Sequence, residues 1–203
     1  MTFERVDESL RCLGGLAAYT TLAVLLMGIW RGTRRQAGRT SGAAARWLRS
    51  GWFYIITTLL FIIICYAGWS PLPLNISPAG RIWLLSFGCI IYFPGMAFIL
   101  WGRLALGHNY FVSSARGAQL FSGHQLITSG PYAIVRHPMY SGLIIAAVGS
   151  LLLYPTWTTL AFTCLAPFIA IRARHEEAAL AAEFGERWEE YSRRVPAFFP
   201  RVR

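Results

Sequence analysis

The chain has 203 residues, of which 55% are hydrophobic and 14% are charged, and its mean hydropathy is +0.45. This composition is too apolar for an ordinary soluble domain and is typical of a small membrane protein with several spans. The formal net charge of +10 comes from arginines that flank apolar runs, a placement typical of membrane topology and anionic lipid headgroups, so we expect no nucleic-acid partner.

The first apolar run covers residues 13–30 and has about the ~20 residues that a helix needs to cross a bilayer. Acidic residues at positions 4, 7 and 8 precede it, which argues against a cleaved signal peptide, so we expect this span to stay in the mature protein. Six arginines follow in residues 31–49, and the positive-inside rule places that loop in the cytoplasm and the N-terminus outside.

A second span is predicted over residues 52–69, with Trp52 and Trp69 as interface anchors at its two ends. The uncharged, proline-rich segment 70–80 then predicts a turn on the side away from the cytoplasm. The third predicted span covers residues 81–101 and contains Pro94, which removes a backbone donor and predicts a kink.

Residues 139–171 carry no charge but are interrupted at 154–157, and each half is short for a full crossing. We therefore expect a helical hairpin with its tip near Pro155. Residues 172–203 are charged and helical in pattern until Pro196, which predicts a cytoplasmic amphipathic helix. The predicted fold is all-α: an integral membrane bundle of five transmembrane segments, divided into N-terminal spans (1–80) and a core (81–203).

Three polar segments are predicted to meet at the cytoplasmic end of this bundle: "GHQLITSGPY" (123–132), "RHPMY" (136–140) and "RARHEE" (172–177). Each has an ordinary interpretation, since Arg172 and Glu176 are spaced as a surface ion pair and Pro138 is well placed to begin a helix. In combination, however, Arg, His and Glu at the mouth of an apolar bundle are costly unless a ligand, water or each other satisfies them.

The pattern therefore predicts a pocket for a polar ligand. The arginine and glutamate suit a zwitterion, and the nearby aromatic residues Tyr110, Phe111, Tyr132, Tyr140 and Trp188 suit a flat ring system. The histidines and the four cysteines lack metal-ligand spacing, so we expect no metal site.

At this point the chain resembles a known family. The segment "HQLITSGPYAIVRHPMYSG", followed about thirty residues later by "RARHEEAALAAEFGERWEEYSRRVPAFFP", is similar to the isoprenylcysteine carboxyl methyltransferase family, which in turn resembles the phospholipid N-methyltransferases. The resemblance covers about residues 103–203. It implies a membrane enzyme that uses S-adenosylmethionine on the cytoplasmic side and takes a lipophilic acceptor from the bilayer.

The resemblance also implies roles for individual residues. Arg172 would hold the acceptor carboxylate and is the expected catalytic residue. The expected cofactor contacts are His124, Gln125, Leu126, Ile127, Tyr132, His137, Pro138, Met139, Tyr140 and Glu176. Methyl transfer is a direct displacement, so these residues mainly position the two reactants and exclude water, and no metal is required.

The expected function is methyl transfer to a lipophilic acceptor, with an isoprenylcysteine-like carboxylate as the leading acceptor. A phenol, amine or thiol would need a base, and His137, His175 and Glu177 are the candidates. The alternatives are a phospholipid N-methyltransferase, a phenolic-lipid O-methyltransferase, and a non-catalytic membrane transporter or assembly factor. Because the chain has arginine but no lysine, which hints at a GC-rich bacterium, we expect a bacterial inner-membrane protein with a cytoplasmic site.

Overall fold

A computed structural model describes residues 3–34, 37–40, 51–110, 113–114, 117–121 and 123–200. The described chain is predominantly helical. Its helices are α1 (Phe3–Thr33), α2 (Gly51–Ala67), α3 (Pro78–Leu106), α4 (Pro138–Leu153), α5 (Trp157–Leu165), α6 (Ile169–Phe184) and α7 (Glu186–Arg194). Short 3-10 turns occupy Gly107–Asn109 (η2), Gly130–Ala133 (η3) and Ala166–Phe168 (η4). Most of the predicted basic loop 31–49, together with Phe111, lies outside the described residues.

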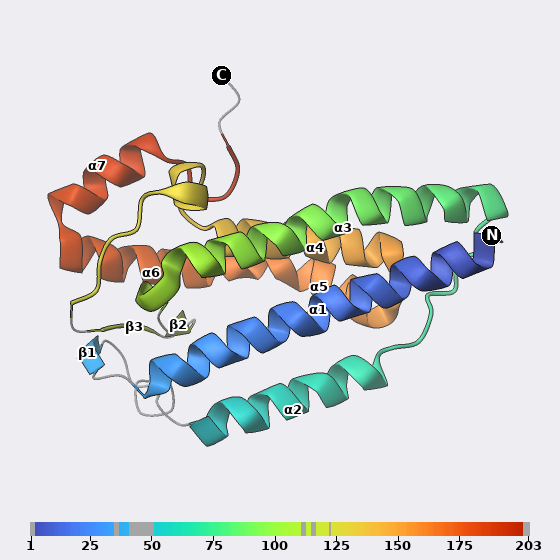
Figure 1. Cartoon of the computed structure of the whole chain (residues 1–203), viewed down its shortest axis with the longest axis horizontal. Coiled ribbons are helices and arrows are strands. Elements are labelled where there is room, and N and C mark those ends of the chain that lie inside the picture. Colours follow the sequence, from blue (N-terminus) through green and yellow to red (C-terminus); the bar gives the residue numbers. More distant parts are fainter. Residues whose placement is uncertain are drawn as a thin grey trace.

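The long helices lie side by side, with α3 between α1 and α4 (Figure 1). At the end of the bundle where α1 and α3 finish, α6, α7 and a small sheet gather. The sheet has the antiparallel order β1-β3-β2, from Ala37–Thr40, Gly117–Phe121 and Ser113–Ser114. The predominantly helical chain agrees with the predicted all-α class, and this small sheet is an addition that the sequence did not predict.

Helices α3 and α4 pack with their backbones almost in contact. A methyl group built on Gly142 would lie 2.7 Å from the carbonyl oxygen of Gly95, and one on Gly149 would lie 2.4 Å from the amide nitrogen of Tyr92. Because no side chain larger than hydrogen fits at such distances, glycine at these positions is what allows α3 and α4 to form the centre of the molecule. Helix α3 itself is continuous through Pro94, which lies inside it.

Helix α1 is attached to α3 by a few polar contacts along an apolar surface. The buried Asp7 carboxylate accepts hydrogen bonds from Arg11 on α1, at 2.7 Å, and from Arg81 on α3. Further along, the Tyr92 hydroxyl donates to the Gly14 carbonyl oxygen at 2.9 Å. Helix α1 begins at Phe3, ten residues before the apolar run that predicted it, and this additional part carries Asp7 and Arg11.

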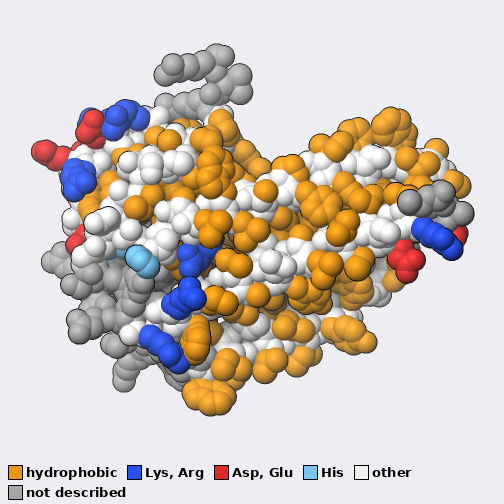
Figure 2. Space-filling view, viewed as in Figure 1, with side chains coloured by type: hydrophobic (Ala, Val, Ile, Leu, Met, Phe, Trp, Pro, Cys, Tyr) orange, Lys and Arg blue, Asp and Glu red, His pale blue; other side chains and the backbone are white. Residues whose placement is uncertain are grey.

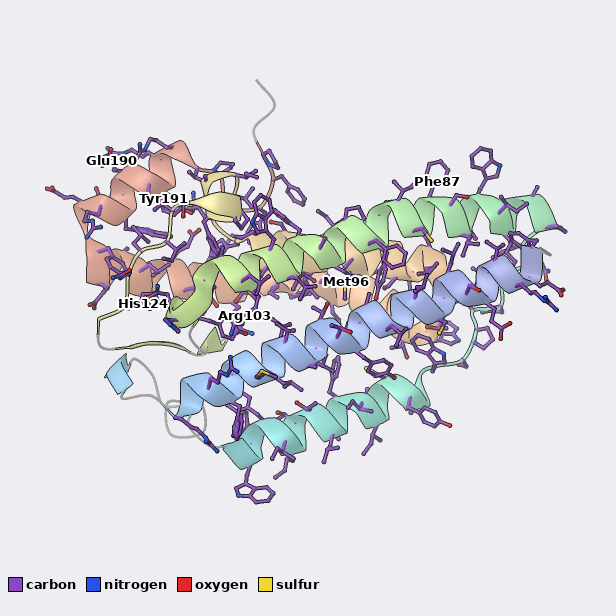
Figure 3. All side chains as sticks on the ribbon, viewed as in Figure 1. Phe87, Met96, Arg103, His124, Glu190 and Tyr191 are labelled. Atoms are coloured by element: carbon purple, nitrogen blue, oxygen red, sulfur yellow. The ribbon has the colours of Figure 1, made fainter. Side chains whose placement is uncertain are left out.

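Among the described residues, two helices, α1 and α3, are long and apolar enough to cross a bilayer. Figure 2 shows hydrophobic side chains over the middle of the visible face and charged side chains toward its two ends, as a membrane protein requires. In Figure 3 Phe87 points outward from α3 while Met96 lies inside the bundle, in agreement with their 51% and 8% exposure. Helices α2 and α4 are apolar but shorter, so the five-span topology remains a prediction.

The C-terminal half differs from its prediction at one point. Residues 154–156 separate α4 from α5, where the sequence predicted the tip of a hairpin, and the Thr156 side chain caps α5 by accepting from the Thr159 amide at 3.3 Å. The single predicted C-terminal helix is instead two, α6 and α7. They meet at Gly185, whose φ of 52° is a left-handed conformation that favours glycine and turns the chain.

Candidate functional site

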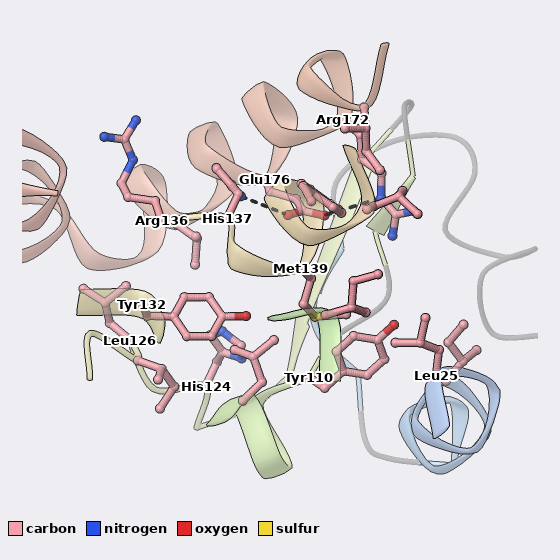
Figure 4. A pocket seen from close by; sticks show the side chains of 18 of the residues that line it. Leu25, Tyr110, His124, Leu126, Tyr132, Arg136, His137, Met139, Arg172 and Glu176 are labelled. Atoms are coloured by element: carbon pink, nitrogen blue, oxygen red, sulfur yellow. Dashed lines mark hydrogen bonds and ion pairs between the residues drawn. The ribbon is translucent and has the colours of Figure 1, made fainter. Parts of the chain in front are cut away.

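A cavity of about 310 Å³ lies between the ends of α1 and α3, the start of α4, and helices α6 and α7. Pro138 begins α4, as expected for a proline in a first helical turn, and this places His137, Met139 and Tyr140 on the cavity wall. The cavity thus brings together residues from Leu22 to Tyr191, which are 169 positions apart in the sequence. Figure 4 shows Leu25 of α1 on one side of it and His137, Glu176 and Arg172 on another.

Glu176 of α6 is the polar centre of this wall. Its Oε1 accepts a hydrogen bond from the Tyr140 hydroxyl and lies 3.4 Å from Nε of Arg172. Its Oε2 lies 3.9 Å from Nδ1 of His137, a distance too long for a hydrogen bond. The Arg172 guanidinium carbon also lies 5.7 Å from the centre of the Tyr140 ring. The predicted i, i+4 ion pair is therefore present, and it faces the cavity (Figure 4).

Glu177, the next residue, makes a separate and tighter network. Its Oε1 accepts hydrogen bonds from Nε and Nη2 of Arg136 at 2.9 and 2.7 Å, and lies 2.9 Å from Nε2 of His137. Burial raises the pKa of the Glu177 carboxyl, but the hydrogen bonds and charges of His137 and Arg136 outweigh burial and the net pKa is lowered. Glu177 is therefore ionised at neutral pH.

The C-terminal segment 192–198 completes this network. Nη1 of Arg136 donates to the carbonyl oxygens of Ser192 and Val195, at 2.9 and 2.7 Å. The amides of Arg136 and His137 donate to the carbonyl oxygens of Pro196 and Ala197, at 2.8 and 3.0 Å. A buried residue that follows, Ser141, donates to the Phe198 carbonyl oxygen at 2.6 Å. The segment 192–198 is thus hydrogen-bonded to residues 136–141 of the site.

The loop 123–132 forms the opposite edge. The backbone amide of Gln125 donates a hydrogen bond to the side-chain oxygen of Asn109 at 3.0 Å. The Tyr191 hydroxyl of α7 donates to the Tyr132 carbonyl oxygen at 2.7 Å. Burial lowers the pKa of the His124 imidazole, against a smaller opposing effect of Glu183, so His124 is neutral at pH 7. A neutral imidazole and backbone groups suit hydrogen bonds to an uncharged ring or sugar.

The remaining wall is apolar and comes mainly from α1. Its residues are Leu22, Leu25, Leu26 and Ile29, with Ile99 and Leu106 of α3, Leu143 of α4, Ile169 and Leu180 of α6, and Tyr110 beside them. One cavity therefore has a charged end and an apolar side.

All of the predicted site residues line this cavity except Pro138, which is fully buried behind the wall against Gly102. Among the predicted base candidates only His137 lines it, whereas His175 and Glu177 do not. Among the described residues, no group of three or more His, Cys, Asp or Glu side chains is arranged to hold a metal ion.

Sequence reasoning missed four contributions to the site: the α1 wall, Arg136 as an anchor, Tyr191, and the C-terminal segment 192–198. Nothing in the sequence indicated that the α1 residues line a site, because an apolar helix face predicts contact with the membrane and contact with protein equally well. The sequence gave some indication of the other three. Arg136 belongs to the same short motif as His137, and Tyr191 and the segment 192–198 belong to the second family-like motif.

Residues 89–182 match the model of the isoprenylcysteine carboxyl methyltransferase (ICMT) family. This part of the chain is similar to that family. The match contains every predicted site residue, and it confirms the resemblance that the sequence motifs indicate. Segment 192–198 and the α1 wall lie outside the matched range.

Curated relatives support the assignment. Protein-S-isoprenylcysteine O-methyltransferase of Schizosaccharomyces pombe is 39% identical over 114 residues, which cover 50% of this chain and 48% of that protein. Methanethiol S-methyltransferase 2 of Bradyrhizobium diazoefficiens is 31% identical over 163 residues, which cover 73% of this chain and 59% of that protein. The chain thus spans about half the length of these curated relatives.

Proposed function

We propose that this protein is an integral membrane methyltransferase that uses S-adenosylmethionine and methylates a lipophilic acceptor at its cytoplasmic face. The observation that carries the proposal is that one cavity joins a charged end, formed by Arg172 and Glu176 within the family match, to an apolar side. The carboxylate of an isoprenylcysteine-like molecule is the acceptor that these two ends fit best. A bacterial inner membrane with several spans is the proposed location.

The residues at the charged end fit the cofactor. Glu176 offers a carboxylate to an ammonium group, His137 offers a ring nitrogen beside that carboxylate, and the neutral His124 offers hydrogen-bonding nitrogens to the sugar or ring. Tyr132, Met139 and Tyr140 offer aromatic and apolar surface to an adenine ring. The same set was expected from the sequence, and its convergence on one cavity is what supports the cofactor proposal.

When bound, S-adenosylmethionine would supply a methyl group on a sulfonium sulfur, which an acceptor oxygen takes as the carbon–sulfur bond breaks and leaves its electron pair on sulfur. A carboxylate acceptor is ionised at pH 7, so the protein needs no base to activate it. Arg172 would hold that carboxylate through charge-assisted hydrogen bonds, while the α1 wall receives its hydrocarbon part and keeps water out.

A thiol acceptor is the second candidate, because the S-methyltransferase relative matches more of this chain than the isoprenylcysteine relatives do. A thiol of pKa about 8.5 must lose its proton to become a good nucleophile. Among the described base candidates, His137 is the one on the cavity wall, so it would take that proton. Arg172 would then have no carboxylate to hold.

Arg172→Ala separates the two candidates. For a carboxylate acceptor we expect unchanged affinity for S-adenosylhomocysteine and a loss of turnover of at least ~100-fold, since the variant loses a charge-assisted pair that orients the nucleophile. Arg174→Ala, an exposed neighbour on α6 that does not line the cavity, is the matched control and should be active.

The assay would follow methyl transfer to N-acetyl-S-farnesylcysteine and, separately, to a short alkyl thiol. Turnover of the farnesylcysteine by Arg172→Ala at the wild-type rate would remove Arg172 from the acceptor site. Activity of the wild type on the thiol alone would favour the second candidate.

A further inference from the structure

The ring of His137 is one of the most tightly held groups in the described structure. It is 6% exposed and lies between two aromatic rings, with centroids 5.6 Å from Tyr140 and 5.4 Å from Phe198 and interplanar angles of 13° and 27°. Its backbone amide is bonded to the Ala197 carbonyl oxygen at 3.0 Å. These contacts fix the plane of the ring and the direction in which each ring nitrogen points.

Nε2 points away from the cavity, to Oε1 of Glu177 at 2.9 Å. That oxygen also accepts two hydrogen bonds from Arg136, and the lowered pKa of the Glu177 carboxyl means that it holds no proton at neutral pH. An ionised carboxylate can only accept hydrogen bonds. Nε2 must therefore carry the proton, and in the neutral imidazole Nδ1 is left as the acceptor.

Nδ1 points toward Oε2 of Glu176, at 3.9 Å. Two acceptors at this separation do not bond to each other, but one donor nitrogen can lie within the usual ~2.7 to 3.2 Å of both. An ammonium group has three donors and a positive charge, so it fits between an imidazole lone pair and a carboxylate oxygen. The position is on the cavity wall, because both residues line the cavity (Figure 4).

We propose that Glu177 is a positioning residue that holds the Nε2–H tautomer of His137, so that Nδ1 and Oε2 of Glu176 form a two-acceptor site for an ammonium group. Glu177 does not line the cavity and acts through His137. The identity of the ammonium as that of S-adenosylmethionine rests on the proposed function, whereas the tautomer does not. Neighbouring Glu176 and Glu177 thus have different tasks: one contacts the ligand and one orients the contact.

Arg136 and the C-terminal segment support Glu177 in this role. The four hydrogen bonds that Arg136 makes through its side chain join Glu177 to the carbonyl oxygens of Ser192 and Val195. Glu177 is therefore anchored in one position while its Oε1 receives Nε2–H. Residues that lie outside the family match are in this way connected to the ligand-binding face of His137.

The first test is the 15N NMR spectrum of the histidine rings in detergent-purified wild-type protein without ligand, at a pH of ~8, where an ordinary histidine is neutral. His137→Gln assigns the His137 signals by subtraction. A donor-type Nε2 and a lone-pair Nδ1 support the proposal. A donor-type Nδ1, or two donor-type nitrogens, would overturn it. This spectrum requires no methyl transfer, so its outcome is independent of the proposed function.

The second test compares ligands with and without an ammonium group. In Glu177→Leu we expect the affinity for S-adenosylhomocysteine to fall by roughly tenfold and the affinity for 5′-methylthioadenosine, which lacks the ammonium and carboxylate, to stay within twofold. Glu177→Gln keeps the accepting oxygen and should retain both the tautomer and most of the affinity. Exposed Glu189→Leu on α7 is the control.

Equal losses for both ligands in Glu177→Leu would mean that Glu177 merely maintains the fold, and the proposal would then be wrong. If Glu177→Leu does not fold, the wild-type spectrum and the Gln variant still decide the tautomer. Failure of every protein to bind either ligand, with the Nε2–H tautomer present, would contradict the proposed function and the ammonium site but leave the positioning of His137 in place.

Discussion

The side of the cavity formed by residues 136–141, α6 and the C-terminal segment is held by hydrogen bonds and charges, whereas the α1 side is held largely by apolar contacts. On the first side, Arg136, His137 and Glu177 are interlocked by bonds of 2.7 to 2.9 Å. On the second side, α1 contributes Leu22, Leu25, Leu26 and Ile29 and no charged group to the cavity lining. The first arrangement suits a ligand of fixed geometry, and the second suits a hydrocarbon chain.

Under the proposed function, this difference would allow one small bundle to bind two unlike reactants. Directional bonds place a few atoms accurately and are costly to break in a buried site, so they suit the cofactor end. Apolar contacts have no preferred direction and tolerate chains of different shape, so they suit a lipophilic acceptor. The rigid centre beneath both sides is the close contact between α3 and α4.

The largest expected effect therefore concerns that centre. Gly149→Ala adds a methyl group 2.4 Å from the Tyr92 amide nitrogen, and we expect it to destabilise the protein by ~2 to 3 kcal/mol because the two helices must separate. Gly15→Ala on α1 meets nothing within 4 Å and should instead be neutral or gain up to ~1 kcal/mol from helix propensity. Thermal unfolding in detergent measures both, and equal melting temperatures would show that α3 and α4 are not closely packed.

A smaller effect should distinguish the two adjacent glutamates. Glu177→Leu leaves Arg136 and His137 without their shared acceptor, and we expect a loss of ~2 kcal/mol of stability, near the value of a charged hydrogen bond. Glu176→Leu breaks the 3.4 Å pair with Arg172 and the hydrogen bond from Tyr140, and should cost about 1 kcal/mol because it removes fewer hydrogen bonds. Chemical unfolding followed by circular dichroism provides the comparison, and a larger loss for Glu176 would reverse the assignment of roles.

The smallest expected effect tests the α1 side. Leu25→Trp narrows the apolar wall, and we expect it to raise the KM for a farnesylated acceptor about tenfold, or ~1.4 kcal/mol, while the affinity for S-adenosylhomocysteine is unchanged. Leu13→Trp places the same side chain at an exposed position of α1 and is the control. A Leu25 variant that loses cofactor affinity instead would place the cofactor against α1.

Much of the fold follows from sequence. The apolar runs predicted α1 to α4, the interruption at 154–157 predicted the boundary between α4 and α5, and Pro138 predicted the start of α4. The length of each apolar run and the positions of the prolines determine these features, and both can be read from neighbouring residues. The break at Gly185 was missed because the charged pattern continues across it, although a glycine within a helical pattern is a recognised signal for a helix end.

The site was predicted in part, and for a physical reason. Residues within one motif share a short stretch of chain, so the grouping of His137 with Tyr140, and of Arg172 with Glu176, needed no three-dimensional information. The contacts of Arg136 with Val195 and of Leu25 with the same cavity join positions that are 59 or more residues apart, and no local pattern encodes such pairings. Glu176 and Glu177 point in directions about 100° apart around α6 and therefore contact different residues. Their separate roles follow from those partners, which only the structure identifies.

The proposed function requires that the cavity binds S-adenosylmethionine through Glu176 and His137. The most direct measurement is calorimetric titration of S-adenosylhomocysteine into detergent-purified wild type, Glu176→Ala and His137→Ala. We expect micromolar binding to the wild type and affinities at least ~10-fold weaker in each variant, because each loses one hydrogen-bonding partner of the ligand worth ~1.5 to 3 kcal/mol when charged. Folded wild-type protein that binds no ligand, or variants that bind as tightly as wild type, would contradict it.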